Sequence, residues 1–500
     1  MRNNKVFRMI IGALKNKTKR SIAVEQIKSK NNPKILLCDN YHINKKNFNS
    51  LFVALKGDSF SFRVALDSGS KDEALALDPS LFEKNQLHQK YISHVKGLTK
   101  QQLLMLSHRN VNVFDIARDE ALSRVLATDH WHAEEIPKDR ADVFHHFWKV
   151  DRQVLHLYCA LSMYWLDFWA DFPGILTYKH CFVFSGSSIY SKSLLNYLKY
   201  SGVKCYVLES FMTGEDYFLE ERHSPISNAS QIQFTTVYSA TKRKPEDYFS
   251  DANLRDQIRV FNKLNDMRNK NVKQPAVQAI PAHLKDKKIT LILTQVVNDY
   301  SIISGDGIIL QTVYLYKMLI EKILKDTDSH IIVKCHPWEK KKLAGGGFTA
   351  LALSKWAESL SKDKRSRITI FDEFNIRQLI EISKHVVTIC SQSAIEAALL
   401  GKKPITIGGA FYDVGGITNK CLDVNEAVHQ LRCHDGLLNI SEFEEFRLFL
   451  VTLIQLHLLN TSNGDARKIA AMLAHKGKQA HNTQQFKELS VAPTWAVEKL

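Results

Sequence analysis

The sequence predicts an α/β protein in which two similar domains face each other across a cleft. In the second half of the chain, short runs of β-branched residues alternate with helical segments, and the first half shows a less regular version of the same alternation. This alternation is typical of parallel sheets with helices on both faces. Each half is therefore expected to form a Rossmann-like domain.

The length and composition agree with a two-domain globular protein. The chain has 500 residues, of which 45% are hydrophobic and 24% are charged. It is too long for one hydrophobic core, and its composition excludes a disordered chain and a multi-span membrane protein. Two long apolar stretches, 155–172 and 446–459, contain charged residues, so we expect buried amphipathic helices there.

In the second half, strands and helices follow one another at regular spacing. The expected strands are 288–295, 330–336, 367–372, 385–390 and 403–409, and the helices between them are 308–325, 349–361, 375–383 and 392–400. In a parallel sheet of this kind, ligands bind beyond the carboxyl ends of the strands. The residues that follow each strand are therefore the candidates for a site.

The first half has weaker signals. Four segments are expected to be strands, 34–38, 112–116, 179–186 and 204–209, and 188–202 is expected to be a helix that stops at a glycine.

These elements divide the chain into five parts. The parts are a basic N-terminal segment 1–30, a first domain 31–270, a linker 271–286, a second domain 287–440, and C-terminal helices with a tail 441–500. A charged helix, 245–268, precedes the linker. The linker contains Pro275 and Pro281, which disfavour regular secondary structure there. The polar tail after residue 461 is expected to pack loosely.

The charge balance favours anionic partners. The chain carries 68 Lys and Arg against 52 Asp and Glu, a formal net charge of +16. No nucleic-acid-binding motif accompanies this charge, so a nucleic-acid partner is not expected. The basic N-terminal segment is either a segment that rests on a membrane surface or a frayed terminus.

Cysteine and histidine residues give no sign of a disulfide framework or a metal site. The eight cysteines are scattered without a CxxC pair, which predicts reduced thiols in the core of a cytosolic protein. The histidines at 130, 132, 145 and 146 match no zinc-site spacing, so no metal site is predicted.

The segment VKCHPW (333–338) places a histidine at a strand end. Pro337 pushes His336 into the extended region and removes a backbone donor. An imidazole there, near Lys334, suits a phosphate oxygen. The alternative is a structural histidine at the start of a loop.

A second polar group follows the strand 385–390. Ser391, Gln392 and Ser393 lie where the next helix begins, and hydroxyls at this place favour an anion. One turn into the helix, Glu396 could reach the ribose hydroxyls of a nucleotide. Ser393 and Glu396 also fit a capping box, which would be a purely structural role.

Two carboxylates follow strands of different domains. Glu209 ends a strand of the first half, and Asp299 follows the first strand of the second half. Across a cleft they could act as acid and nucleophile, whereas the alternative is that each caps a loop. Acidic residues cluster near Glu209, namely Glu215, Asp216, Glu220 and Glu221, and most of this cluster is expected to form a solvated face.

In their order and spacing, these segments resemble the bacterial capsule polysaccharide synthesis family, the β-Kdo transferases that build the Kdo linker of exported capsules. The segments are strand–SGSS–helix, LES…YFLEE…SPISNAS, TQVVNDYSII, VKCHPW and SQSAIEAALLGKKPITIGGAFYDVGGIT. The last is the most specific, because the family has a Ser-Gln-x-x-x-Glu-Ala helix followed by Gly-Lys-x-Pro and an Ala-Phe-Tyr turn. The resemblance covers roughly 180–420. It departs at Ala394, where a glycine is common, and at 210–214, which usually carries glycine and Arg-Pro.

The resemblance implies a GT-B-like fold and a retaining glycosyltransferase that moves Kdo from CMP-Kdo to a lipid-linked acceptor, a phospholipid or glycolipid. It implies that Asp299 is the nucleophile and Glu209 the acid/base group, and the hydroxyls of Ser187 and Ser188 are predicted to bind the acceptor. The predicted donor-nucleotide residues are Lys334, His336, Pro337, Ser391, Gln392, Ser393 and Glu396. No metal cofactor is expected, because CMP is a good leaving group once its phosphate is neutralised.

The expected location is peripheral, on the cytoplasmic face of the inner membrane, because a basic surface is attracted to anionic lipid. Other capsule assembly proteins are candidate partners. Three alternatives remain: a GT-B transferase that uses another nucleotide sugar, a non-catalytic capsule assembly or export factor, and a nucleic-acid-binding protein. The presence of both Glu209 and Asp299 disfavours the second, and the missing base-reading modules disfavour the third.

Overall fold

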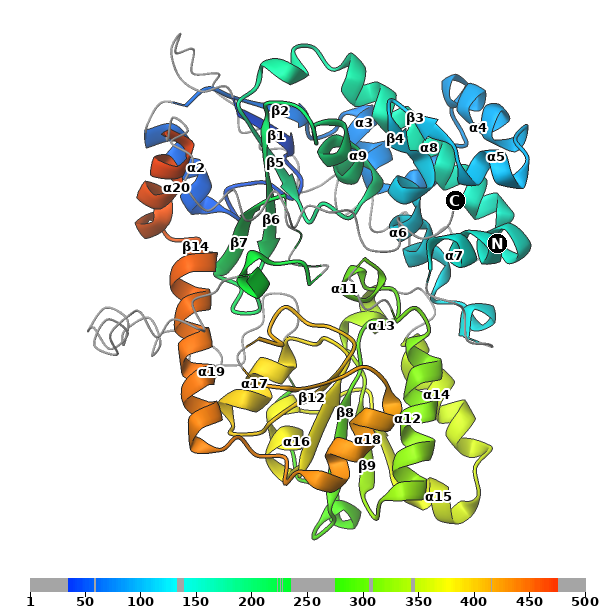
Figure 1. The fold of residues 1–500 in the computed structure, drawn as a ribbon, viewed down its shortest axis with the longest axis vertical. Helices are drawn as coiled ribbons and strands as arrows, with labels where there is room; N and C mark the ends of the chain where they lie inside the picture. Colours follow the sequence, from blue (N-terminus) through cyan, green and yellow to red (C-terminus); the bar gives the residue numbers. More distant parts are fainter. Residues whose placement is uncertain are drawn as a thin grey trace, which may run out of the picture.

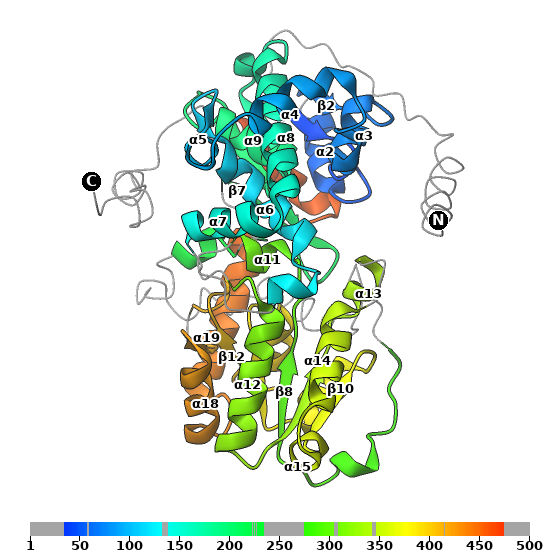
Figure 2. The ribbon, with the colours of Figure 1, turned by 90° about the vertical axis from the view of Figure 1, so that its right-hand side faces the viewer.

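The structure is a computed structural model, and it arranges the chain in two α/β domains (Figures 1 and 2). It describes residues 35–57, 60–132, 139–222, 224, 226, 228–234, 275–304, 309–342, 347–414 and 416–474. The basic segment 1–30 and the expected helix 245–268 lie outside the described residues.

The first domain is built on a six-stranded sheet in the order β14-β7-β6-β5-β1-β2. Its parallel strands are β1 (Ile35–Asp39), β2 (Phe62–Leu66), β5 (His180–Phe184) and β6 (Lys204–Ser210). Two antiparallel strands complete one edge, β7 (Asp216–Glu221) and β14 (Leu458–Asn460). Three of the four predicted strands are confirmed as β1, β5 and β6.

The fourth predicted strand, 112–116, is wrong. Only Val111–Asn112 forms a short strand, and helix α6 (Val113–Val125) begins directly after it. The Asn112 side chain accepts a hydrogen bond from the backbone N–H of Asp115, so it caps the helix. A run of β-branched and aromatic residues favours a strand, but here the apolar residues are buried along a helix instead.

The second domain has a six-stranded parallel sheet in the order β10-β9-β8-β11-β12-β13. The strands are β8 (Ile289–Leu293), β9 (His330–Lys334), β10 (Ile368–Phe371), β11 (His385–Thr388), β12 (Ile405–Ile407) and β13 (Asn419–Cys421). The helices are α12 (Thr312–Asp326), α14 (Phe348–Glu358), α16 (Ile376–Ile382), α17 (Ser393–Leu399) and α18 (Val424–Cys433). All five predicted strands and all four predicted helices of this half are therefore confirmed, and β13 and α18 extend the pattern.

The two long apolar stretches are partly buried helices, as predicted. The first is α8 (Arg152–Asp171), whose buried face packs on α6 and on α9 (Ile189–Tyr197). The second falls in α19 (Ile440–Thr452) and the π-helical turn after it. Within the part of the chain that the structure describes, no helix is long and apolar enough to cross a membrane.

The C-terminal segment returns to the first domain. Figure 1 shows α19 running from the second domain to the first, where β14 pairs with β7. Helix α20 (Ala466–Ala474) then packs on α2 (Asn49–Gly57) and buries Ile469 and Leu473. The expectation of loose packing after residue 461 is therefore wrong as far as Ala474, because apolar side chains attach this segment to the first sheet.

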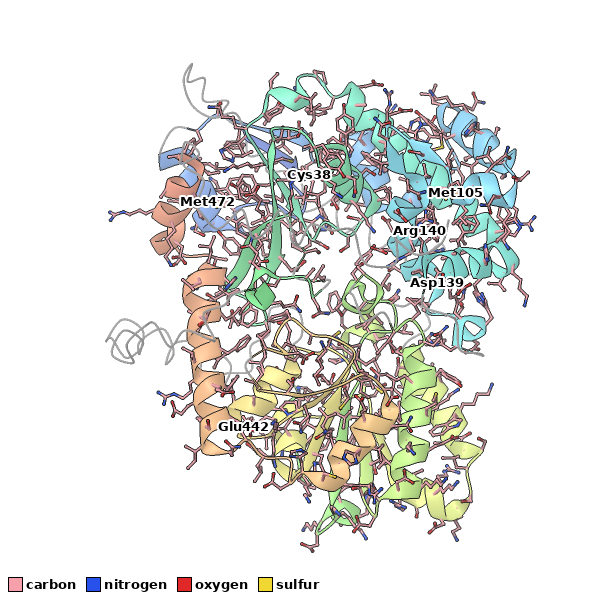
Figure 3. The ribbon with its side chains drawn as sticks, in the orientation of Figure 1. Cys38, Met105, Asp139, Arg140, Glu442 and Met472 are labelled. Atoms are coloured by element: carbon pink, nitrogen blue, oxygen red, sulfur yellow. The ribbon has the colours of Figure 1, made fainter. Side chains whose placement is uncertain are left out.

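Side chains fill both domains (Figure 3). The parallel strands β1 and β8 are buried on both faces, so their side chains form a continuous apolar layer between the helices. All eight cysteines are free thiols, and seven of them, including Cys38, are buried; only Cys433 is exposed. This agrees with the predicted core thiols.

Candidate functional site

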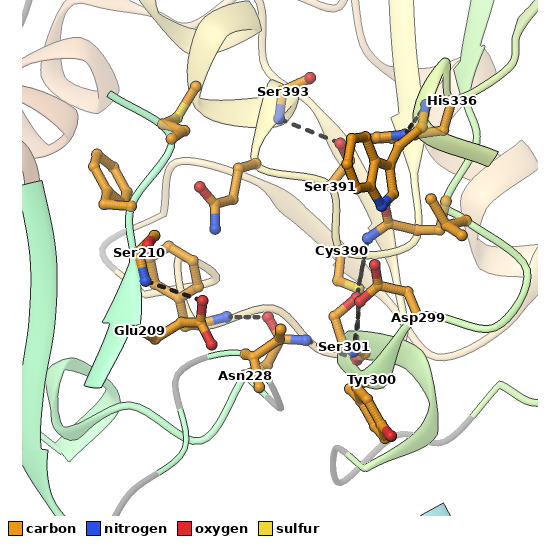
Figure 4. Close-up of a pocket in the computed structure, with 18 of the residues that line it drawn as sticks. Glu209, Ser210, Asn228, Asp299, Tyr300, Ser301, His336, Cys390, Ser391 and Ser393 are labelled. Carbon is orange, nitrogen blue, oxygen red and sulfur yellow. Dashed lines mark hydrogen bonds between the residues drawn. The ribbon is translucent and has the colours of Figure 1, made fainter. Parts of the chain in front are cut away.

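A cavity of about 390 Å³ lies where the carboxyl ends of the two sheets meet (Figure 4). The first domain contributes side chains from β5, β6 and β7, and the second domain contributes the segments that follow β8, β9 and β11. A site at this place follows the general rule for parallel α/β sheets. The predicted GT-B-like fold, two Rossmann-like domains facing a cleft, is therefore confirmed.

The cavity brings together most of the predicted site residues. Seven of them line it, namely Glu209, Asp299, His336, Ser391, Gln392, Ser393 and Glu396. Four others lie outside the lining, namely Ser187, Ser188, Lys334 and Pro337.

Asp299 is the N-cap of a one-turn helix, α11 (Tyr300–Ile303). Its Oδ1 accepts a hydrogen bond from the backbone N–H of Ser301 at 2.9 Å. The capping role considered from the sequence is thus present, and the same carboxylate also lines the cavity. A capped turn fixes the position of the carboxylate.

Glu209 lies near the end of β6, on the first-domain wall, and its exposed fraction is 9%. Its Oε1 accepts a hydrogen bond from the backbone N–H of Ser210 at 2.9 Å. Figure 4 shows Glu209 and Asp299 on opposite sides of the cavity. The two domains thus each present one carboxylate to the same space.

His336 stands at the turn after β9. Its Nδ1 accepts a hydrogen bond from the backbone N–H of Trp338 at 3.2 Å. With Nδ1 as the acceptor, a neutral ring carries its proton on Nε2. The ring is then a hydrogen-bond donor, which suits an anionic ligand oxygen.

The capping box considered for Ser393 and Glu396 does not form. The N-cap of α17 is Gln392, and its side chain makes no capping bond. The backbone N–H of Ser393 instead donates to Oγ of Ser391 at 3.3 Å. The capping box considered from the sequence is therefore wrong.

Glu396 lines the cavity with an unsatisfied carboxyl oxygen. Its Oε2 has no hydrogen-bond partner among the described residues. Burial raises the pKa of Glu396 to about 7, because a low-dielectric environment disfavours the charged form. This oxygen is therefore available to a hydrogen-bond donor that enters the cavity.

Lys334, predicted to bind the nucleotide, instead hydrogen-bonds to backbone carbonyls inside the second domain. Its Nζ donates to the carbonyl oxygens of Cys335 at 2.6 Å and Asp372 at 2.9 Å. Burial lowers the pKa of Lys334 to about 8. The amine connects the ends of β9 and β10 rather than facing the cavity.

Ser187 and Ser188 also lie away from the cavity lining. Ser187 is buried at the start of α9, and Oγ of Ser188 lies 3.1 Å from Oγ of Ser191. These contacts belong to the first turn of α9. The acceptor role of the two hydroxyls therefore stays a prediction without support from the cavity.

The acidic residues after Glu209 are only partly solvated. Glu215 and Glu221 are exposed, but Asp216 and Glu220 are buried. Asp216 accepts hydrogen bonds from Oγ1 of Thr213 and Nδ2 of Asn460. Glu220 accepts from Oγ of Ser230 and the backbone N–H of Gln231. The predicted solvated face is thus wrong for these two, because they organise the chain around β7.

Asn228 is a cavity residue that the sequence did not single out. Its φ of 59° is in the left-handed region, which Asn tolerates better than most residues. Its Nδ2 donates to the carbonyl oxygen of Ser301 at 3.0 Å, and its Oδ1 accepts from the backbone N–H of Phe411 at 3.3 Å. Asn228 thereby connects the first domain to α11 and to the segment after β12 in the second.

Helix α6 of the first domain also holds the Asp299 turn; Figures 1 and 2 place α11 beside it. Nη2 of Arg118 donates to the carbonyl oxygen of Ile303 at 2.9 Å, and Oγ of Ser304 donates to Oδ2 of Asp119 at 2.9 Å. Burial opposes the ionisation of Asp119, but the cations of Lys192 and Arg118 hold its pKa below the usual value. A charged acceptor strengthens this contact.

The second domain holds the same turn from the other side. The buried carboxylate of Glu339 accepts hydrogen bonds from the backbone N–H groups of Val297 at 2.9 Å and Thr349 at 2.8 Å. Glu339 follows the His336 turn by three residues. The turns that carry His336 and Asp299 are therefore fixed relative to each other.

No group of three or more His, Cys, Asp or Glu side chains that could hold a metal ion occurs among the residues the structure describes. The cavity instead offers hydroxyls, an imidazole and three carboxyls.

Comparison with known proteins gives one family and several structural similarities. A sequence model of the family described as capsule polysaccharide biosynthesis protein matches residues 215–445. This match confirms the predicted family resemblance. No curated protein matches the sequence significantly.

Among solved structures, Thermosulfurimonas dismutans KpsC, β-Kdo 2,4 transferase, has 15% identity, covering 57% of this chain and 82% of that chain, with a TM-score of 0.41. The β-Kdo 2,7 transferase of the same KpsC has 18% identity, covering 59% and 84%, with a TM-score of 0.35. The glycosyltransferase SnogD from Streptomyces nogalater has 11% identity, covering 88% and 99%, with a TM-score of 0.27.

Proposed function

Because residues 215–445 carry the sequence signature of the capsule polysaccharide biosynthesis family, we propose that this protein is a capsule glycosyltransferase that transfers Kdo from CMP-Kdo to a lipid-linked acceptor with retention of configuration. One observation carries the proposal. Glu209 of the first domain and Asp299 of the second line one cavity, together with His336, Ser391 and Glu396. This is the set of groups that a double displacement on a nucleotide sugar needs.

In this proposal the second-domain wall binds the donor. The Nε2–H of His336 and the hydroxyls of Ser391 and Ser393 donate hydrogen bonds to the phosphate of CMP. The carboxyl of Glu396 accepts hydrogen bonds from the ribose hydroxyls, which satisfies its free oxygen. The donor sugar then extends toward Asp299.

The chemistry takes two steps. A carboxylate oxygen of Asp299 attacks the anomeric carbon of Kdo while the bond from that carbon to the phosphate oxygen breaks, and CMP leaves with the bonding electrons. Glu209 then takes the proton of an acceptor hydroxyl, whose oxygen attacks the same carbon and releases Asp299. Two inversions give net retention.

The proposal assigns no step to a metal ion. The donors on His336, Ser391 and Ser393 stabilise the negative charge of the departing phosphate, so transfer is expected to persist in the presence of a chelator. Loss of transfer on chelation, with recovery on addition of Mg²⁺, would contradict this part of the proposal.

Peripheral attachment to the inner face of the inner membrane completes the proposal. The first twenty residues contain seven basic residues, namely Arg2, Lys5, Arg8, Lys15, Lys17, Lys19 and Arg20. Each contributes about 1 kcal/mol near anionic lipid, screened by salt. Binding to phosphatidylglycerol vesicles should therefore weaken as salt rises, and salt-independent binding would argue against it.

The central experiment measures nucleotide release from a panel of nucleotide sugars, with the anomeric configuration of the product read by NMR. CMP release from CMP-Kdo, with a retained product, is the expected result. Release only from another nucleotide sugar would support the alternative donor. Nucleotide binding without release from any donor would support a non-catalytic capsule factor.

A further inference from the structure

Three aromatic rings lead from the protein surface to the first-domain wall of the cavity. The ring of His42, in the loop between β1 and α2, stacks on Phe184 with a centroid distance of 4.8 Å and an interplanar angle of 5°. The ring of Tyr41 meets His42 edge-on, also at 4.8 Å. Phe184 lines the cavity, whereas half of Tyr41 is exposed, so the row connects the two.

His42 is oriented by a buried acid–phenol pair. Oδ1 of Asp39 accepts from the backbone N–H of His42 at 2.7 Å and lies 3.4 Å from the ring Nδ1. The hydroxyl of Tyr190 donates to Oδ2 of Asp39 at 3.2 Å and lies 3.3 Å from the same Nδ1. The Nδ1 atom of His42 is thus engaged by Asp39 and Tyr190, whereas Nε2 makes no hydrogen bond within the described residues. The His42 side chain is 29% exposed.

The loop itself is held in one conformation by its asparagines. Nδ2 of Asn44 donates to the carbonyl oxygen of Tyr41 at 2.7 Å, and Nδ2 of Asn47 donates to the carbonyl oxygen of His42 at 2.8 Å. The backbone N–H of Asn47 also donates to Oδ1 of Asn44 at 3.1 Å. Such a preorganised loop loses little entropy when a ligand binds.

Positive charge follows the aromatic row. Lys45 and Lys46 are exposed, and the neighbouring ammonium of Lys56 lowers the pKa of Lys45. Cations held close together attract an anionic group. The loop therefore offers rings for a sugar and ammonium groups for a carboxylate or phosphate.

We propose that Tyr41 and His42 form an acceptor subsite that binds an anionic saccharide, with its ring against the aromatic row and its anionic group at Lys45 and Lys46. This inference rests on the proposed function. If the donor occupies the second-domain wall, an acceptor hydroxyl reaches Glu209 along the first-domain wall, where Phe184 lies. Nε2 of His42 then hydrogen-bonds a sugar hydroxyl on the way to the cavity.

The test compares Tyr41→Ala, His42→Ala and Lys45→Gln with the wild type, and Tyr200→Ala is the control because Tyr200 is 90% exposed on another surface segment. Saturation-transfer NMR with two probes, free Kdo and glycerol 3-phosphate, measures binding without catalysis. We expect the first two variants to weaken Kdo binding at least about 10-fold, with the control unchanged and CMP affinity unchanged in all.

The two probes separate the sources of the anionic group. Weaker binding of Kdo alone in Lys45→Gln assigns the lysines to a sugar carboxylate, and weaker binding of glycerol 3-phosphate alone assigns them to a lipid headgroup. The subsite would be overturned if each probe bound every variant as tightly as it binds the wild type. It would also be overturned if neither probe bound the wild type.

Kinetics distinguish failure of the subsite from failure of the proposed function. If the wild type transfers Kdo, His42→Ala should raise the acceptor KM while the hydrolysis of CMP-Kdo by water stays unchanged. An unchanged acceptor KM overturns the subsite alone. If no Kdo is released from CMP-Kdo at all, the proposed function is contradicted. In that case, weaker binding of the Kdo probe to Tyr41→Ala than to the wild type would still support the subsite.

Discussion

Ser123 and Asn298 exchange two hydrogen bonds across the domain boundary. Oγ of Ser123 donates to the carbonyl oxygen of Asn298 at 3.2 Å, and Nδ2 of Asn298 donates to the carbonyl oxygen of Ser123 at 2.8 Å. Asn298 directly precedes Asp299. The carboxylate assigned as the nucleophile is therefore positioned partly by α6, a helix of the opposite domain.

Removal of this reciprocal pair should slow transfer without weakening the binding of CMP. In Ser123→Ala and Asn298→Ala, the Asp299 turn loses hydrogen bonds to α6, so kcat is expected to fall about 10-fold while CMP affinity stays constant. Each variant removes one of the two bonds, because each side chain donates to the backbone carbonyl of the other residue, so each should lower the free energy of unfolding by about 0.5–1.5 kcal/mol.

Ser366→Ala is the matched control, because Ser366 is exposed and bonds only within its own turn. An equal loss of kcat in this control, or an unchanged kcat in both Ser123→Ala and Asn298→Ala, would remove the positioning role of α6.

Asp299→Asn should abolish transfer while leaving the fold intact. The amide oxygen of Asn can still accept the N–H of Ser301, so the cap of α11 and the melting temperature should be nearly unchanged. The charge needed for attack on the anomeric carbon is lost, so the rate should fall by roughly 10³-fold or more. Calorimetry with CMP and a transfer assay measure the two properties, and near-normal transfer would contradict the assignment.

His336→Ala should weaken the binding of CMP, whereas Lys334→Met should lower the stability of the fold. In the proposed mechanism the first removes a donor to the phosphate, so CMP affinity should fall about 5- to 150-fold, the equivalent of 1–3 kcal/mol. The second removes two buried hydrogen bonds, so unfolding free energy should fall by about 1–3 kcal/mol while CMP affinity per folded molecule is unchanged. Calorimetry measures CMP affinity, and chemical denaturation measures the free energy of unfolding. A selective loss of CMP affinity in Lys334→Met would show that Lys334 does contribute to the site.

Glu396 should make the stability of the ligand-free protein depend on pH. Its pKa rises from 4.5 to about 7 on folding, so its contribution is fully present below pH 4.5 and is lost as pH rises through 7. Between about pH 4.5 and 7.5 the wild type should lose on the order of 1–3 kcal/mol relative to Glu396→Gln. Chemical denaturation at several pH values measures this difference. The exposed Glu445→Gln should follow the wild type, and parallel profiles for all three proteins would exclude the raised pKa.

The second domain could be predicted almost completely from the sequence. Its central strands β8, β9 and β11 are short apolar runs that are buried on both faces, and a helix follows each of them before the next strand. This local regularity also located His336, Ser391 and Glu396, because each follows a strand of one parallel sheet. Their convergence on one cavity required only the general topology of such sheets.

The first domain was predicted less well because its contacts are not local in the sequence. β7 pairs with β14, which lies more than two hundred residues further along the chain. No local pattern of hydrophobic residues predicts this pairing. The burial of Asp216 depends on Asn460 for the same reason. Asn228 and Ser123 act through partners in the other domain, so only the assembled structure identifies them as part of the site.

The return of the chain through α19 makes the second domain an insertion within the first, and this affects the order in which the protein can fold during synthesis. The sheet of the first domain is complete only after β14 has been translated, about 240 residues after β7. At typical elongation rates this delay is roughly 10–50 s.

During that interval the second domain, whose sheet is encoded without interruption, has time to fold first. The edge of β7 meanwhile presents unpaired backbone groups to other chains. The nascent protein is therefore expected to depend on a chaperone, or on slow translation, at the stage when the first domain is present but still lacks its last strand.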